Sequence, residues 1–179
     1  MSGVIIRALE PSEWEAFREF RLTSLKASPG VFSFSYDQAT AQSPQDWRTA
    51  IKGDDHQVFG IFDDERLVGV TGAFSYEGDP TGQTAVLVMS FILPSHRRRG
   101  LSRMLYEARL AWILAHPKFR RVLVAHRKSN EASRRANQRH GFRLTHTVSH
   151  VWPDGETGDE VFYELELRND RHENEEARQ

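Results

Sequence analysis

The sequence contains no cysteine, and this absence excludes several kinds of chemistry. Without thiols the chain forms no disulfide bond, offers no thiolate to a zinc ion and has no cysteine nucleophile. A chain without disulfides also suits a reducing compartment. The apolar run at 4–6 is too short for the core of a signal peptide, and acidic residues follow it early. We therefore expect a cytoplasmic protein.

Long apolar runs and an excess of one charge are missing as well. No run approaches the roughly 20 apolar residues of a membrane-spanning helix, so we expect no membrane partner. The 24 Lys and Arg residues nearly balance the 25 Asp and Glu residues, which leaves a formal net charge of -1. A chain with this balance is not a polyanion binder over its whole surface. Any basic character is local, and we expect no nucleic-acid partner.

The sequence does contain β-type runs that alternate with helical patterns, over a length that suits one domain. Strands are predicted at 4–9, 57–62, 67–76, 84–93, 120–126, 142–152 and 160–167, and helices at 11–28, 43–53, 101–115 and 130–140. The order predicts an α/β fold: a single mixed, mostly antiparallel sheet of about seven strands, flanked by about four helices.

Domain boundaries follow from composition. We expect one domain over residues 1–168 and a polar, frayed tail over residues 169–179, where one alanine is the only apolar residue. The predicted strand at 84–93 is almost wholly apolar, which is typical of a central strand covered on both faces.

Three consecutive arginines stand between this apolar strand and an amphipathic helix, in the stretch "LPSHRRRGLSRMLYEARLAWI". The first turn of a helix has unpaired N–H groups and the positive end of the helix dipole, so it holds an anion through its backbone. Gly100 permits a close approach of the backbone, and the arginines suit phosphate oxygens. A solvated charge cluster is the alternative. The position between a buried strand and a helix favours a phosphate-binding turn.

The same stretch resembles the acyl-CoA-binding motif of the GNAT superfamily of N-acetyltransferases. That motif, Gln/Arg-x-x-Gly-x-Gly/Ala, follows the family's fourth strand and falls here on Arg97, Gly100 and Ser102. The segment "RRVLVAHRKSNEASRRANQRHGF" is similar to the family's fifth strand, its asparagine (here Asn130), its fourth helix and its Gly-Phe ending. The likeness spans roughly residues 3–167. It implies the acyl-CoA N-acyltransferase fold, with the fourth and fifth strands splayed apart.

The resemblance implies acetyl-CoA as cosubstrate. Backbone amides around the turn would hold the pyrophosphate, and the pantetheine arm would pair like an extra strand with the edge that the splay opens. Asn130 would contact the CoA arm, or serve only as a helix cap. The cofactor-binding residues implied in this way are Ser90, Phe91, Ile92, Arg97, Arg98, Arg99, Gly100, Leu101, Ser102, Arg103, Asn130 and Asn137.

The implied reaction is direct acetyl transfer to a primary amine of a small molecule or a protein. The site must hold amine and thioester together, polarise the thioester carbonyl and remove a proton. A lysine-like amine with a pKa near 10.4 costs about 4 to 5 kcal/mol to deprotonate at neutral pH, so a base or a desolvating pocket helps. His126, at the end of the predicted strand 120–126, is the candidate base. Tyr76 and Glu77 are further candidates for the acceptor side.

The sequence departs from the family pattern at two points. Ser102 stands where many members have Gly or Ala, and its small side chain is compatible with the turn. Many members also carry a tyrosine seven residues after the asparagine, which acts as general acid to the leaving thiolate; here that position is Asn137. Asparagine has no acidic proton near neutral pH. An acyl-CoA-binding protein or sensor with little or no transferase activity is therefore a second interpretation.

Other residue patterns leave further questions open. Phe32, Phe34 and Tyr36 alternate, and they line an aromatic acceptor pocket or belong to the core. The eight histidines include no HxH or HExxH pair, so we expect no metal. Dimers are common among the proteins that the chain resembles, so a homodimer is one possible state.

Overall fold

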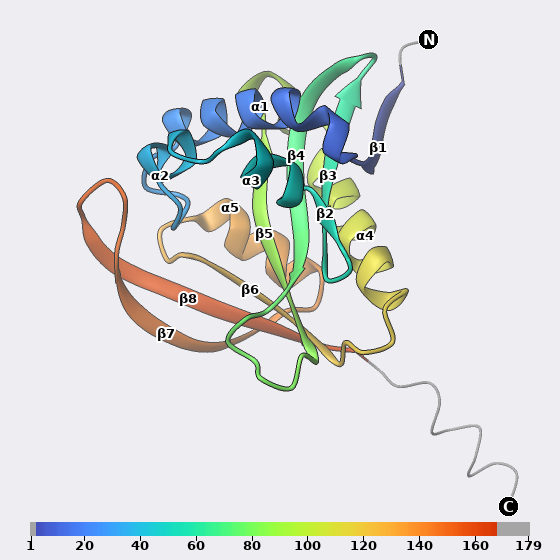
Figure 1. Cartoon of the computed structure of the whole chain (residues 1–179). Helices are drawn as coiled ribbons and strands as arrows, with labels where there is room; N and C mark the ends of the chain where they lie inside the picture. The colour runs from blue at the N-terminus through green and yellow to red at the C-terminus, as the bar shows by residue number, and fades with distance from the viewer. Residues whose placement is uncertain (1–2, 168–179) are drawn as a thin grey trace, which may run out of the picture.

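The computed structural model describes residues 3–167, so the predicted tail at 169–179 lies outside the described residues. The strands are β1 (Val4–Ala8), β2 (Lys52–Gly53), β3 (His56–Asp63), β4 (Arg66–Ser75), β5 (Thr84–Ile92), β6 (Arg121–Arg127), β7 (Arg143–Val151) and β8 (Thr157–Glu166). The helices are α1 (Trp14–Ala27), α2 (Tyr36–Thr40), α3 (Pro44–Thr49), α4 (Leu101–Leu114) and α5 (Glu131–Arg139), with 3₁₀ turns η1 (Pro11–Glu13) and η2 (Pro94–His96). After β1 the chain forms three helices and then four strands, and α4 and α5 flank β6 before the last two strands (Figure 1).

The strands form one open sheet in the order β1-β3-β4-β5-β6-β8-β7, and β2 pairs with β3 off this path. Only the pair β5 and β6 is parallel. The predicted mixed, mostly antiparallel α/β sheet is confirmed, with β2 as a short unpredicted addition. The predicted helix 43–53 is too long. It ends at Thr49 because Ile51 turns into the core, where it is fully buried, and the chain then pairs with β3.

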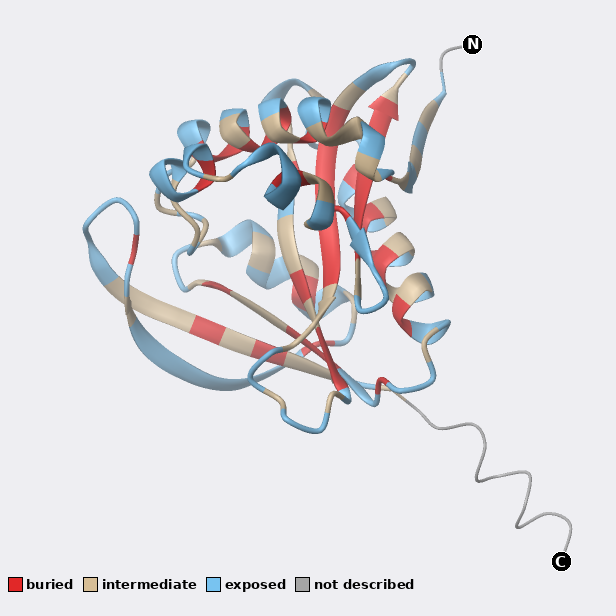
Figure 2. Cartoon of the chain, in the orientation of Figure 1, coloured by how far each residue is buried: buried red, intermediate tan, exposed pale blue. Residues whose placement is uncertain are grey.

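Helices cover both faces of the sheet, and β3 and β4 are buried between them (Figure 2). On one face, α1 and α3 bring Phe17 and Trp47 into a cluster that includes Phe91 of β5. On the other face, α4 packs Tyr106 against Leu87 of β5. The predicted burial of β5 on both faces is therefore confirmed.

The sequence analysis missed one helix, α2. Its first turn is closed by a capping box, in which Ser35 Oγ accepts a hydrogen bond from the Gln38 backbone N–H at 3.0 Å. The Gln38 side chain accepts one from the Ser35 backbone N–H at 2.8 Å. The pattern Ser-x-x-Gln is a known start signal for a helix. The sequence analysis instead interprets the alternating aromatic residues up to Tyr36 as a pocket wall or a part of the core.

The strands β5 and β6 pair over a short length and then separate. Their register runs from Thr84 opposite Arg121 to Leu87 opposite Val124, although both strands continue beyond this point. The predicted splay of the strands at 84–93 and 120–126 is confirmed. Beyond Leu87, β5 therefore has no neighbouring strand on its β6 side within residues 3–167.

A β-bulge marks the point of separation. In the pairing of β4 with β5, Gly72 lies opposite Val88, so that Met89 and Ser90 face a single residue of β4. Met89 takes a left-handed φ of 61°, which is unusual for a residue with a side chain. Bulges of this kind bend a strand and redirect its side chains. The bulge therefore shapes the gap between β5 and β6.

Candidate active site

The separation of β5 and β6 opens a cavity of about 440 Å³ in the middle of the sheet. Arg21 of α1 and Phe34 line it from one side. Tyr106 and Arg109 of α4 and Asn137 of α5 line it from the other. The cavity therefore lies between the two helical layers, with the splayed strands as its frame.

A second cavity of about 390 Å³ adjoins the first on the side of α1. Arg21 and Phe34 line both cavities. The remaining wall of the second cavity is mainly apolar, with Phe17, Trp47 and Phe74 among its lining residues. The two cavities together offer room for two ligands that meet at the splayed strands.

The turn before α4 presents a row of backbone N–H groups that have no partner in the described part of the chain. Within residues 3–167, no backbone carbonyl accepts a hydrogen bond from the N–H groups of residues 98–102. Arg98 and Gly100 both take left-handed conformations, with φ of 62° and 80°. Turns with such residues gather N–H groups into an anion-binding concavity, and the helix dipole adds to its potential. The predicted cofactor residues Leu101 and Ser102 are the first residues of α4.

Two of the arginines around this turn use their side chains in local contacts. Arg97 Nε donates a hydrogen bond to the backbone carbonyl of Ile92 at 3.0 Å, and its guanidinium lies 5.3 Å from the centre of the Phe91 ring. Arg103 pairs with Glu107 one turn along α4, at 2.6 Å. Arg97 thus fastens the turn to the end of β5.

The other two arginines differ in their contacts. Arg99 lies 3.3 Å from a carboxylate oxygen of Asp63, which His96 approaches at 3.2 Å. Arg98 forms no ion pair with any residue that the structure describes. The positive charge of the turn is partly neutralised, so an anion here relies mainly on the backbone N–H groups and on Arg98.

The three predicted contacts on β5 lie where the strand has lost its neighbour. Phe91 and Ile92 pair with Val70 and Gly69 of β4 and have no partner strand on their β6 side within residues 3–167. The side chain of Phe91 is buried against α1. Ser90 is part of the bulge and its hydroxyl turns toward α4, where it meets Arg109. An extended ligand therefore meets only the backbone edge of Phe91 and Ile92.

Asn137 is fully buried at the wall of the cavity formed by α5. Its side-chain carbonyl accepts a hydrogen bond from the Tyr106 hydroxyl, whereas its Nδ2 atom has no partner in the described part of the chain. Burial raises the pKa of Tyr106, so the hydroxyl stays protonated and remains a donor at neutral pH. Because this donor fixes the carbonyl side of the amide, the NH2 group is left to donate to a ligand.

His126 is buried at the end of β6 and lines the same cavity. Its Nδ1 atom lies 2.8 Å from the backbone carbonyl of Arg127 and donates to it, so the neutral ring carries its lone pair on Nε2. That Nε2 atom has no partner among residues 3–167. Burial lowers the pKa of His126 below its ordinary value of 6.5, which keeps the ring neutral at neutral pH. The neutral side chain can therefore accept a proton on Nε2, as a general base does.

Arg109 is a buried cation that the sequence analysis did not identify. Its Nη1 donates to Ser90 Oγ at 2.8 Å and its Nε donates to the Leu105 carbonyl at 3.0 Å, while Nη2 has no partner among the described residues. Burial lowers its pKa to about 10, so the guanidinium remains charged at neutral pH. It supplies positive charge directly beneath the bulge, where negative charge would be stabilised.

Asn130 has the capping role that was one of its two predicted functions. Its side-chain oxygen accepts a hydrogen bond from the Ser133 backbone N–H at 3.1 Å, and α5 begins at the next residue. Both Asn130 and Ser133 also line the cavity. The cap holds α5, and with it Asn137, against the cavity.

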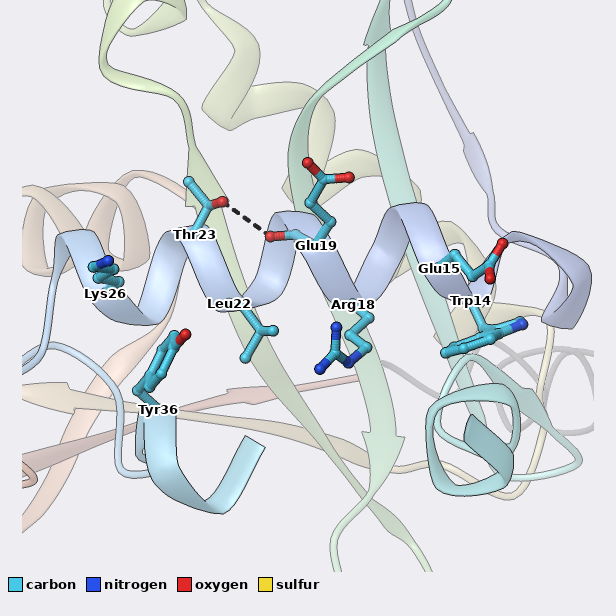
Figure 3. A pocket seen from close by; sticks show the side chains of 8 residues that line it. All are labelled: Trp14, Glu15, Arg18, Glu19, Leu22, Thr23, Lys26 and Tyr36. Atoms are coloured by element: carbon cyan, nitrogen blue, oxygen red, sulfur yellow. Dashed lines mark hydrogen bonds between the residues drawn. The ribbon is translucent and has the colours of Figure 1, made fainter. Parts of the chain in front are cut away.

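The predicted aromatic trio separates in the structure. Phe32 and Phe34 line the cavity, but Tyr36 begins α2 and lies in an open groove on the outer side of α1 (Figure 3). This groove shares no residue with the two cavities. The two acceptor-side candidates do lie together: Tyr76 lines both cavities and Glu77 lines the second.

Two further observations concern other kinds of site. Within residues 3–167, no three His, Asp or Glu side chains are placed to hold a metal ion. No helix in the described part of the chain is long and apolar enough to cross a membrane.

The sequence model of the acetyltransferase (GNAT) family matches residues 12–142, from η1, just before α1, to the turn that follows α5. The chain belongs to the GNAT acetyltransferase family. This confirms the resemblance carried by the arginine-glycine turn and by the segment around Asn130. No curated protein matches the chain in sequence.

Solved structures share the GNAT fold at low sequence identity. An acetyltransferase of the GNAT family from Streptococcus pneumoniae superposes with a TM-score of 0.79 and 17% identity, over 92% of this chain and 100% of that one. An N-acetyltransferase from Staphylococcus aureus Mu50 gives 0.73 and 20%, over 93% and 100%. The protein yncA from Salmonella typhimurium, with its cofactor acetyl-CoA, gives 0.78 and 17%, over 94% and 96%. At these identities the likeness establishes the shared fold.

Proposed function

We propose that this GNAT protein transfers the acetyl group of acetyl-CoA to a primary amine, by direct attack of the amine on the thioester in a ternary complex. Family membership supports acetyl transfer in general, and a structural neighbour was solved with acetyl-CoA. The observation that carries the proposal is the cavity between β5 and β6. There a buried acceptor atom, His126 Nε2, and a buried donor atom, Asn137 Nδ2, have no partner among residues 3–167.

The residues of the chain suit acetyl-CoA as the cosubstrate. The free N–H groups of residues 98–102 match the oxygens of a pyrophosphate. The edge of β5 beyond Leu87 has no neighbouring strand within residues 3–167 and matches the amides of a pantetheine arm. When bound, acetyl-CoA supplies an activated acyl group whose carbonyl is open to an amine.

His126 acts as the base in this proposal. Its Nε2 atom accepts a proton from the ammonium form of the acceptor, either directly or through one water, and the neutral amine then attacks the thioester carbon. As the carbon–sulfur bond breaks, the second N–H proton leaves the nitrogen for solvent, from which the thiolate is protonated after it leaves. A positioned base of this kind contributes about 10²- to 10⁴-fold to rate. The lowered pKa keeps the Nε2 atom of His126 unprotonated at neutral pH, so that it can accept a proton.

Asn137 stabilises the leaving sulfur when the carbon–sulfur bond breaks. Its amide cannot protonate a thiolate, but its NH2 group can donate a hydrogen bond to one, with Tyr106 holding the amide in this orientation. Arg109 adds positive charge beneath the bulge. A cysteine thiol has a pKa of about 8.5, and in our proposal the alkyl thiolate of CoA likewise leaves without a general acid.

A protein that binds acyl-CoA without transferring the acyl group is the second candidate function. The observation that favours it is Asn137, which stands where many family members carry a tyrosine acid. This alternative keeps the phosphate-binding turn and the free edge of β5 but assigns no chemistry to His126. Binding assays alone do not separate the two functions.

Release of free thiol from acetyl-CoA in the presence of a panel of primary amines separates them. We expect thiol release that depends on the amine, with a matching mass increase of the amine by one acetyl group. If acetyl-CoA binds but no acetyl group is transferred to amino acids, polyamines or peptide N-termini, the acyl-CoA-binding alternative is favoured.

A further inference from the structure

A second buried arginine lines the two cavities on the side of α1. Arg21 lies on α1, is 3% exposed and lines both cavities. Its guanidinium stacks 4.3 Å from the centre of the Phe32 ring, and its one hydrogen bond within residues 3–167, from Nη1 to Ser24 Oγ, is long at 3.4 Å. Burial lowers its pKa to about 10, so it is charged at neutral pH.

No carboxylate in the described part of the chain pairs with Arg21. Other arginines of the protein do have such partners; Arg127, for example, contacts both Asp154 and Glu156. A buried charge without a partner costs several kcal/mol of stability, and an aromatic face with one long hydrogen bond compensates only a part of this. A ligand that supplies a carboxylate would complete the pair, because the guanidinium fork matches that group in both geometry and charge.

The position of Arg21 points to the acceptor rather than to the phosphates of the cofactor. None of residues 97–103 lines either cavity, whereas Arg21 lines both. Met89, the bulge residue, also lines both cavities. A ligand held by Arg21 therefore lies beside the bulge, where the amine must meet the thioester.

The second cavity adds information about the rest of the acceptor. Its wall is mainly apolar and aromatic, formed by residues that include Phe17, Phe34 and Phe74. Trp47 contributes a buried Nε1–H donor that has no partner among residues 3–167. A side chain that is apolar over most of its surface fits this cavity.

Negative charge is also available, at a different place on the lining. Glu160 lines the first cavity with its side chain 16% exposed, and Glu77 lines the second cavity. Neither forms an ion pair with Arg21. The acceptor site thus offers a cation and carboxylates at separate positions, which suits a ligand with both an ammonium and a carboxylate.

We propose that the acceptor is a free amino acid with a large apolar or aromatic side chain, and that Arg21 binds its carboxylate. The inference rests on the proposed function, because it takes the amine of this ligand as the group that is acetylated. Arg21 selects the substrate, the second cavity holds the side chain, and the amino group is directed to the bulge of β5.

Paired acceptors test the proposal without any variant. L-phenylalanine, its primary amide and phenethylamine share an amine and an aromatic ring, but only the first carries a carboxylate. We expect kcat/KM for the amino acid to exceed that for either neutral analogue by about 10- to 150-fold, the range of one hydrogen-bonded charge pair. Equal or better turnover of the neutral amines would overturn the proposal.

Variants then assign the preference to Arg21. Arg21→Met should abolish the preference for the carboxylate, mainly through KM, and Arg21→Lys should keep part of it. Arg18→Met is the matched control, since Arg18 lies on the same helix in the outer groove (Figure 3). Thermal unfolding identifies a variant that fails to fold. A preference that survives in a folded Arg21→Met protein, or an equal loss of acetyl-CoA affinity, would overturn the assignment.

Binding measurements distinguish this proposal from the proposed function. Calorimetric titration of L-phenylalanine into the protein saturated with CoA reports acceptor binding without any turnover. Binding that requires Arg21, in a protein that transfers no acetyl group, would support the carboxylate site and reject the transferase. Acetyl transfer to amines without carboxylates would support the transferase and reject the carboxylate site.

Discussion

The turn before α4 and the second cavity are built in different ways. On the cofactor side, consecutive residues of one turn offer their backbone N–H groups, and residues 98–102 are all within one short stretch. On the acceptor side, Arg21, Phe34, Trp47 and Phe74 come from separate elements and meet only in the folded protein. In our proposal the cofactor is held by backbone geometry, whereas the acceptor is selected by side chains. This difference explains why the sequence reveals one partner and hides the other.

The largest effect is expected from a change in the cofactor turn. Gly100→Glu forces a side chain into a left-handed conformation, with φ of 80°, and brings a negative charge to the N–H groups. We expect no measurable acetyl-CoA binding by calorimetry. Gly82→Glu is the matched control, because Gly82 also has a positive φ of 66° and open space around it. Wild-type affinity in a folded Gly100→Glu protein would remove the turn from the cofactor site.

His126→Ala tests the base at the meeting point of the two sides. We expect kcat to fall by about 10²- to 10⁴-fold at neutral pH, with acetyl-CoA affinity unchanged. Because burial lowers the pKa of His126, the wild-type rate should fall as pH decreases through a value below 6.5; the variant should lack this limb. His116→Ala is the control, since its Nδ1 also contacts a backbone carbonyl, that of Trp112, outside both cavities. Identical pH profiles for wild type and His126→Ala would exclude the base.

Asn137 and Tyr106 should show a smaller effect on the leaving-group step. Asn137→Ala is expected to lower kcat by about 10- to 100-fold, the range of one lost charge-assisted hydrogen bond. Tyr106→Phe should lower it less, since it only frees the amide to rotate. A double-mutant cycle on kcat checks the coupling: the double variant should be no slower than Asn137→Ala. Additive effects would show that Tyr106 acts independently.

The smallest effect is expected at a contact between the loop after α1, which leads to Phe32 and Phe34, and the β7–β8 hairpin. A Cβ atom on Gly30 would overlap Asp154 Oδ2 and Arg127 Nη1. Gly30→Ala must therefore displace the ion pair of these two residues, which joins residue 30 to the β7–β8 hairpin. We expect a several-fold increase in the acceptor KM and a loss of about 1 kcal/mol of stability. Acetyl-CoA affinity should not change; if it alone changes, the contact serves the other side of the cavity.

The parts of the molecule that local patterns encode could be predicted from the sequence. The apolar β5, the helix α4 and the Asn130 cap each follow from residues within a few positions of one another. The bulge at Met89 could not, because it depends on the register of β5 against β4. Neither could the gathering of aromatic side chains around the second cavity.

The two buried arginines carry a signal that helical spacing could have revealed. Arg21 stands four residues after Phe17 and four before Leu25, and all three are buried on one face of α1. Arg109 has the same place between Leu105 and Ile113 of α4. A charged residue in the middle of an apolar stripe is buried with its helix face. The spacing alone therefore indicates a buried charge at both positions.

Calorimetric titration tests the central claim most directly, namely that acetyl-CoA is held by the backbone turn before α4 and by the free edge of β5. The comparison ligand is an adenosine bisphosphate that lacks the pantetheine arm. We predict micromolar binding of acetyl-CoA that weakens strongly when the arm is absent, since both halves of the site are then needed. Absence of binding at millimolar acetyl-CoA would contradict the account, and the unpaired N–H groups of the turn would require another anion.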